Sequence, residues 1–253
     1  MSEFWRYREL ILKLAQVDLK NRYQNTALGF LWSLLSPLML ALVLFFVFRY
    51  LYKQEPNFAA YLLVGLMSWR FFAISTTSSI YSIVGKSSLV TKVYIPREIL
   101  VLSSALANLI SSLLEFVIII PILYIVSGSL PFTIFLFPLV FMIYFWFAYG
   151  ISLCLAALYV YFRDINQIWE VLVNILFFLS PIIYPMVSIT DKITPFYLLN
   201  PLTEFIIMFR DVMIYGRLPS AYSLAITTGF TVAIYLVGRF IFNRLQRRFA
   251  EEM

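Results

Sequence analysis

The chain has 253 residues, of which 62% are hydrophobic and only 13% are charged, with a net charge of +6. Soluble domains carry about 45–50% apolar and about 25% charged residues, so this composition excludes an ordinary soluble protein. Histidine is absent and the single Cys154 lies in an apolar run, which excludes a Cys/His zinc site, a His-based catalytic triad and a disulfide within one chain.

The first segment, from Phe4 to Tyr23, alternates basic and apolar residues at helical spacing. One face of the predicted helix carries Tyr7, Leu10, Ile11, Leu14 and Val17. This pattern favours a helix that lies in the membrane interface with its cations near anionic headgroups, and we assign residues 1–28 to it. A solvated N-terminal helix is the alternative. The segment has no plain apolar core of the kind found in secretory signals.

Six apolar runs follow, each close to the roughly 20 residues that a bilayer-spanning helix needs. The expected spans are Phe30–Tyr50, Tyr61–Val84, Ile99–Val126, Thr133–Tyr161, Ile168–Met186 and Tyr222–Phe242. We therefore expect an all-α integral membrane protein with a single domain over 1–253. Its membrane part covers 30–242, and 243–253 form a cytoplasmic tail.

The basic residues are distributed unequally between the two sides of the predicted membrane. Thirteen lie on the side of the termini: Arg6, Arg8, Lys13, Lys20, Arg22, Lys86, Lys92, Arg97, Arg163, Arg239, Arg244, Arg247 and Arg248. Six lie on or near the other side: Arg49, Lys53, Arg70, Lys192, Arg210 and Arg217. The positive-inside rule makes both termini cytoplasmic and accounts for the net charge without nucleic-acid binding.

One long loop, 187–219, lies on the outer side and contains the apolar segment 200–216. Asn200 suits the N-cap of a short helix and Pro201 its first turn. The segment is too short to span the bilayer and indicates a re-entrant or interfacial helix between the fifth and sixth spans. With Glu204 and Arg210, these residues are candidates for an outer gate. A helix lying on the surface is the alternative.

The tripeptide Gly85-Lys86-Ser87 has the appearance of a phosphate-binding loop. Such a loop needs a glycine five residues before the Gly-Lys pair, and that position is Ile80 in a predicted membrane helix. The motif is therefore rejected, and ATP, if it drives the protein, must bind to another chain.

Polar side chains recur at helical spacing within the third span: Ser104, Asn108, Ser111, Ser112 and Glu115. Hydrogen bonding to a neighbouring helix is favoured over a substrate path. Glu115 lies about 16 Å below the outer end of its helix, and Arg70 reaches about 14 Å in the second span. Their matched depth predicts an intramembrane ion pair, because a charge at that depth needs a partner.

Aromatic residues make up 19% of the chain, more than two interface belts require. Packing in the core and against lipid is favoured for any single ring. Collectively the excess suggests a channel whose apolar rings pack against the C–H faces of sugars. The candidate channel-lining residues are Trp32, Phe45, Phe177, Phe178 and Tyr184.

Several segments, taken in order, resemble the type 2 ABC transporter permeases that export polysaccharides. They are VDLKNRYQNTALGFLWSLLSPLM (17–39), YLLVGLMSWRFF (61–72), SSLVTKVYIPREIL (87–100), YFRDINQ (161–167), SPIIYP (180–185) and LLNPLTEFI (198–206). Each motif is weak by itself, but the ordered set covers nearly the whole chain.

The resemblance implies a homodimer of this subunit that binds a dimer of a separate ATPase, in the bacterial inner membrane. ATP and Mg would bind to the ATPase, and this chain would hold no cofactor or metal and perform no catalysis. A lipid-linked glycan such as O-antigen would pass through a channel, with a teichoic-acid-type polymer as the alternative. A secondary transporter or channel working alone is the rival from another class.

The resemblance also assigns a coupling helix that docks on the ATPase to the loop between the second and third spans, from Ser87 to Glu98. The expected coupling residues are Ser87, Lys92, Tyr94, Ile95, Pro96, Arg97 and Glu98, with Lys86 just before them. Arg163 and Asp164 mark a second cytoplasmic contact, and the N-terminal helix would lie near the lipid headgroups.

Overall fold

The computed structural model describes residues 6–24, 29–52, 55, 57–93, 95–186, 197, 199–249, 251 and 252. All regular secondary structure in these residues is helical. Five of the described helices are long and apolar enough to cross a membrane. They are α3 (Leu31–Phe48), α4 (Phe58–Ile80), α6 (Glu98–Ser127), α7 (Phe137–Tyr161) with the short turn η2 (Phe132–Leu136) before it, and α11 (Ala221–Leu245).

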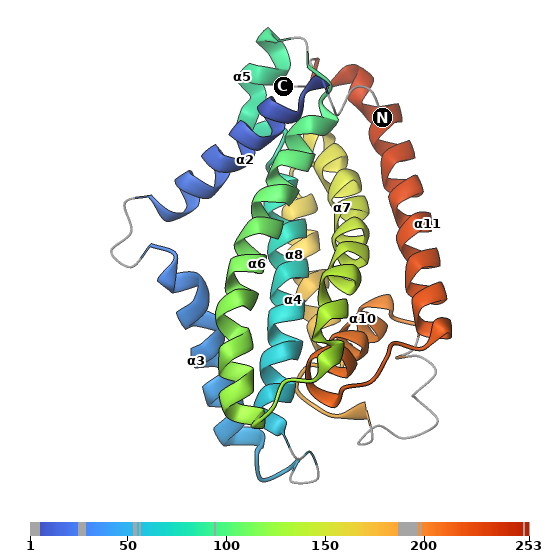
Figure 1. Ribbon diagram of the computed structural model, residues 1–253. Coiled ribbons are helices and arrows are strands. Elements are labelled where there is room, and N and C mark those ends of the chain that lie inside the picture. Colours follow the sequence, from blue (N-terminus) through green and yellow to red (C-terminus); the bar gives the residue numbers. More distant parts are fainter. Residues whose placement is uncertain are drawn as a thin grey trace.

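Helix α4 lies at the centre of the bundle, between α3, α6 and α7 (Figure 1). Of the 18 most apolar consecutive residues of α4, 78% are buried within the chain. The corresponding share is 22% for α3 and 17% for α11. The peripheral helices expose long apolar faces, as expected for surfaces in contact with lipid or with a second copy of the chain.

The expected fifth span, 168–186, is helical over only part of its length. Helix α8 (Ile165–Phe178) has 14 residues, or about 21 Å, which is less than the roughly 30 Å of a bilayer core. The helix ends shortly before Pro181, whose missing N–H and bulky ring disfavour continuation. Hydropathy predicted the apolar run but not this break in the helix.

The segment 200–216 forms α10 (Pro201–Arg210) and a π-helical turn, η4 (Asp211–Tyr215). The Asn200 side chain accepts a hydrogen bond from the amide of Leu202 at 3.1 Å, which confirms the predicted N-cap. Most of α10 is buried, and the helix packs against α4, α7 and α11. The alternative of a helix lying on the surface is therefore wrong.

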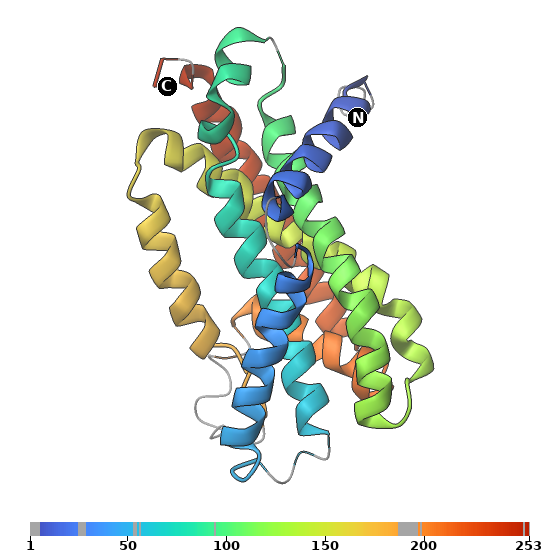
Figure 2. The same ribbon diagram turned by 90° about the vertical axis from the view of Figure 1, so that its left-hand side faces the viewer.

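One end of the molecule gathers three short elements that are distant in sequence (Figures 1 and 2). These are the start of α2 (Arg8–Tyr23), helix α5 (Ser87–Lys92) and the turn η5 (Gln246–Arg248). Helix α2 packs on α6 and buries Ile11 and Ala15, whereas Val17 of the expected apolar face is 51% exposed.

Helices α7 and α11 pack closely because glycines meet where they cross. A Cβ atom on Gly238 would overlap the carbonyl oxygen of Gly150, and one on Gly150 would lie 2.8 Å from Cα of Tyr235. Small residues allow close backbone approach in this way between helices in membranes.

Candidate functional site

The predicted coupling segment divides into an exposed part and an anchored part. Ser87 and Lys92 of α5 are exposed, while Val90 is buried against the bundle. Ile95 and Pro96 are half-buried, and Tyr94 lies outside the described residues. Glu98 is not directed outward, because its carboxylate is buried and accepts a hydrogen bond from the hydroxyl of Tyr149 at 3.3 Å.

The C-terminal turn joins the coupling segment to the end of α7, which leads into the 162–164 loop. The Arg97 guanidinium donates to the carbonyl of Gln246 and lies 6.0 Å from the ring centroid of Phe249. Phe249 is fully buried and packs on Tyr161, whose hydroxyl donates to the carbonyl of Leu245 at 2.8 Å. These contacts hold three separate chain segments together at one end of the molecule.

The second loop follows directly from α7. Arg163 and Asp164 are both exposed, and the Arg163 guanidinium lies 5.2 Å from the ring centroid of Tyr159. Tyr159 packs edge-on against Tyr81 at the end of α4, with ring centroids 5.1 Å apart. Through Tyr159 of α7, the loop is therefore linked to the same end of α4 that leads into the coupling segment.

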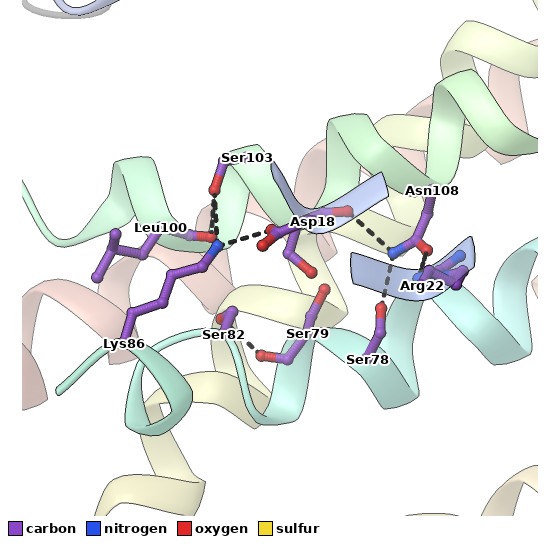
Figure 3. Close-up of polar contacts among 10 residues, drawn as sticks. Asp18, Arg22, Ser78, Ser79, Ser82, Lys86, Leu100, Ser103 and Asn108 are labelled. Carbon is purple, nitrogen blue, oxygen red and sulfur yellow. Dashed lines mark hydrogen bonds and ion pairs between the residues drawn. The ribbon is translucent and has the colours of Figure 1, made fainter. Parts of the chain in front are cut away.

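A polar seam connects α2 to α4 and α6 (Figure 3). We use this name for the hydrogen-bonded residues Asp18, Arg22, Tyr23, Ser78, Lys86, Ser103, Asn108 and Ser111. The Lys86 ammonium donates to the Asp18 carboxylate at 2.6 Å and to the Ser103 hydroxyl at 3.3 Å. Lys86 ends the turn η1 (Val84–Lys86), so the seam reaches the residue before α5.

The polar stripe predicted on the third span supplies the α6 side of this seam. Asn108 accepts a hydrogen bond from Arg22 at 2.6 Å and donates one to Ser78 at 2.7 Å (Figure 3). Ser111 is bonded to the hydroxyl of Tyr23 at 2.6 Å. The stripe therefore serves as a contact between helices, although the sequence did not identify α2 as the partner.

The structure brings Arg70 and Glu115 together, with Nε of Arg70 at 3.6 Å from Oε2 of Glu115. They line a cleft of about 550 Å³ whose other walls include Arg22, Tyr23 and Trp32. Two guanidinium groups and one carboxylate leave this cleft with a net positive charge, which suits an anionic group. Arg22 also lines a neighbouring cleft of about 430 Å³ that contains Asp18 and Lys86.

Many of the aromatic rings pack against one another in the core of the bundle and do not line an open surface. Phe71, Phe141, Tyr144 and Phe209 interlock α4, α7 and α10 with ring centroids 4.8 to 6.1 Å apart. The five channel-lining candidates are less buried. Trp32 is 52% exposed and Phe178 is 66% exposed, whereas Phe45, Phe177 and Tyr184 are half-buried.

Two of the four outer-gate candidates lie inside the bundle, while Asn200 and Pro201 are half-buried. Glu204 is buried, and Arg210 is 2% exposed with its guanidinium bonded to backbone carbonyls. Tyr215 of η4 donates a hydrogen bond to Glu55 at 2.6 Å, which ties this segment to the loop before α4. Burial and the neighbouring Glu55 carboxylate raise the pKa of Tyr215 above its usual value, so the phenol remains a donor.

Sequence reasoning missed several residues of these sites. Tyr161, Gln246 and Phe249 join the loops at one end, and the single aromatic ring in the polar tail was the available signal. Asp18 was missed because an acidic residue on a basic helix has no periodicity that marks a partner 68 residues away.

Comparison with known proteins matches residues 9–214 to the ABC-2 type transporter family. The chain is 32% identical to the O-antigen export system permease protein RfbA of Klebsiella pneumoniae, over 96% of this chain and 94% of that protein. It is 31% identical to the protein of the same name from Myxococcus xanthus, over 100% and 98% of the two chains. Identity to the capsule polysaccharide export inner-membrane protein CtrC of Neisseria meningitidis serogroup B is 24%, over 83% and 82%.

The two O-antigen permease matches cover 96% and 100% of this chain, and they agree with the helical membrane bundle described above. The chain belongs to the ABC-2 type transporter family.

Proposed function

We propose that this chain is the membrane-spanning subunit of an ATP-driven exporter that moves lipid-linked polysaccharide, O-antigen or a similar glycan, across the inner membrane. The observation that carries the proposal is its similarity to O-antigen export permeases over 94% and 98% of their lengths. Membership of an ABC family argues against the rival of a secondary transporter that works without an ATPase.

A separate ATPase dimer is the proposed source of energy, with ATP and Mg bound to that partner and no catalytic role for this chain. The end that carries α5, Arg97, the 162–164 loop and η5 suits the docking of such a partner. A cleft of about 380 Å³ there is lined by Tyr7, Ile95, Pro96, Arg97 and Gln246. Lys92 and Arg163 are exposed and add positive charge to the segments at this end.

Two copies of the chain would form the channel, with both termini cytoplasmic. In this arrangement α8 and the non-helical residues after Phe178 together serve as the fifth of six spans. The exposed rings of Trp32 and Phe178 would face the channel, because apolar rings in contact with sugar C–H groups allow a polymer to slide without strong polar binding. The half-buried rings of Phe45, Phe177 and Tyr184 would line it less directly.

The positively charged cleft under α2 is the proposed place for the phosphates of the lipid-linked substrate. Arg22 and Arg70 would bind the phosphate oxygens, and Trp32 would lie beside the lipid chain. This assignment follows from charge and from the position of the cleft between α2, α3 and the centre of the bundle.

The proposal is tested by deleting the gene in its native host and measuring surface glycan, intracellular lipid-linked glycan and ATPase copurification with the tagged chain. We expect surface glycan to disappear, lipid-linked glycan to accumulate inside, and an ABC ATPase to copurify. Restoration by the wild-type chain, but not by an Arg22→Glu, Arg70→Glu variant, would support the role of the cleft.

Normal surface glycan in the deletion strain, or no accumulated lipid-linked polymer, would contradict the export proposal. Analysis of the accumulated polymer distinguishes O-antigen from a teichoic-acid-type chain. If the tagged chain is purified without any ATPase, the alternative of transport by this chain alone is favoured.

A further inference from the structure

The backbone after α8 has carbonyl groups that no helix satisfies. Helix α8 ends at Phe178, and residues 179–185 contain no helix. Ser180 and Ile182 are fully buried in the bundle. Non-helical backbone at membrane depth persists only where the protein supplies its hydrogen-bond partners, so this break requires donors from elsewhere in the chain.

Arg210 supplies these donors from α10. Its Nη1 donates to the carbonyl of Pro181 at 2.7 Å and its Nη2 to that of Ile182 at 3.0 Å. Its Nε donates to the carbonyl of Tyr61 on α4 at 3.3 Å. The guanidinium lies 3.3 Å from the ring centroid of Tyr61. The planar guanidinium thus joins α10, on which it lies, to α4 and to the residues after α8. A lysine ammonium has a single nitrogen and cannot make all of these contacts.

The charge of Arg210 is accommodated without a carboxylate. Among the described residues, ion pairs to carboxylates are formed by Arg70 and Lys86, and not by Arg210. Carbonyl dipoles and the face of Tyr61 stabilise the buried cation instead. Gly65 provides the space, because a Cβ atom there would lie 2.5 Å from Nη2 of Arg210.

Two further contacts hold the same unit together. The Tyr61 hydroxyl donates to the carbonyl of Tyr184 at 2.8 Å, and the Asn200 amide donates to the Ser180 hydroxyl at 3.0 Å. The residues after α8, helix α10 and the outer half of α4 are therefore joined by several buried hydrogen bonds.

The body of α8 is held much less firmly. Trp169 is the buried residue of this helix, and its indole donates to the hydroxyl of Thr76 at 3.1 Å. Phe177 packs on Trp69 with ring centroids 5.6 Å apart, while Val171 and Ile175 are exposed. An element with few buried contacts needs little free energy to move relative to its neighbours.

We propose that Arg210 fixes the pivot about which α8 moves during transport. Helices α4 and α10 and the break after α8 remain one rigid body, and α8 is the wall that changes position. Arg210 and Gly65 are then positioning residues of the pivot and not parts of an opening gate. The proposal rests on the proposed ATP-driven export.

Distances between spin labels test this in the full complex with its ATPase, in lipid nanodiscs, with Cys154→Ser to remove the native thiol. One label pair replaces Ala59 on α4 and Arg217, whose amide donates to the carbonyl of Asp211 directly after α10, so the pair reports on the fixed body. The other pair replaces Ala59 and Asn174, which is exposed on α8. On addition of ATP and Mg, we expect the first distance to stay constant and the second to shift beyond its resting distribution.

Variants of Arg210 and Gly65 give a second measurement. Arg210→Lys keeps the charge but loses the forked guanidinium and its three hydrogen bonds. We therefore expect a broader distribution of the distance between the labels at positions 59 and 217. Export should fall at least fivefold while ATP hydrolysis is retained. Gly65→Ala should act in the same direction. Arg217→Lys, on the exposed side of the same segment, is the matched control and should leave export unchanged.

An ATP-dependent change in the distance between positions 59 and 217 overturns the pivot, and so does an exporting complex whose α8 does not move. If Arg210→Lys does not accumulate in the membrane, the wild-type label pairs decide the question alone. A deletion strain with normal surface glycan would instead remove the export proposal, which the distances do not measure.

Discussion

Arg70 and Glu115 meet where neither charge is stable alone. Their side chains are 24% and 5% exposed, so removing one partner leaves the other poorly solvated. We expect Arg70→Gln or Glu115→Gln to lower the free energy of unfolding by about 1–3 kcal/mol, and the double substitution to cost less than the sum. Thermal unfolding of the detergent-solubilised protein measures this, with the exposed Lys20→Gln as control. Additive effects would show that the two side chains do not interact.

Asp18 and Lys86 form a more accessible pair, with side chains 22% and 18% exposed. Such a pair contributes about 1 kcal/mol or less to global stability, but it fixes a helix that buries few apolar residues. We expect Asp18→Lys to speed hydrogen exchange in α2, because two cations then face each other. The exchanged pair, Asp18→Lys with Lys86→Asp, should restore slow exchange.

Lys13→Asp is the matched control for that experiment, because Lys13 is exposed on the same helix and changes the net charge of α2 in the opposite direction. Equal exchange in α2 for the wild type and Asp18→Lys would mean that the Asp18–Lys86 pair does not contribute to holding the helix.

The crossing of α7 and α11 depends on two glycines. We expect Gly238→Val to destabilise the protein by about 1–3 kcal/mol, because the added atoms overlap the backbone of Gly150 and force the helices apart. Thermal unfolding is again the measurement. Gly229→Ala, in open space on α11, is the control and should be neutral or slightly stabilising. Equal melting temperatures for both variants would show that the helices do not approach each other as described.

Helices were predicted well from the sequence, and their packing was not. Apolar length located five spans within a few residues, and Asn200 with Pro201 marked the start of α10. The end of α8 was missed because hydropathy averages over the break. The burial of α10 was missed because its stabilising contact, between Arg210 and Tyr61, joins residues 149 positions apart.

The same distinction holds for the site residues: those marked by their depth in the bilayer were predicted, and those that depend on helix packing were not. Glu115 and Arg70 were predicted from depth alone, since rise per residue converts sequence position into depth in a bilayer. The contacts of Phe249 and Asp18 depend on which helices lie side by side. The lone ring in the tail marks Phe249 as unusual but does not identify its partners, and nothing in the sequence marks Asp18. Glu98 was expected to be an outward charge, yet the first turn of α6 directs it toward Tyr149.

At the scale of the whole molecule, the elements near both chain ends lie beside α5 at one end of the bundle (Figure 1). The charge asymmetry of the sequence predicts that this end is cytoplasmic. We expect a fluorescent protein fused after residue 253 to fluoresce, because it folds in the cytoplasm. Alkaline phosphatase fused after Arg217 should be active, because it requires the oxidising outer side. The reverse pattern of activities would mean that the orientation is wrong.

The central position of α4 has a consequence for how the protein is made. Its mean hydropathy, 1.5, is the lowest of the five long apolar helices, and the helix carries Arg70 and several hydroxyl groups into the bilayer. A helix of this kind partitions weakly from the translocon into lipid by itself. It needs α6 to neutralise Arg70 and α10 to cover its outer half, and both are synthesised later. We therefore expect insertion of α4 to be completed only when these neighbours emerge, so that membrane integration and folding of this chain coincide.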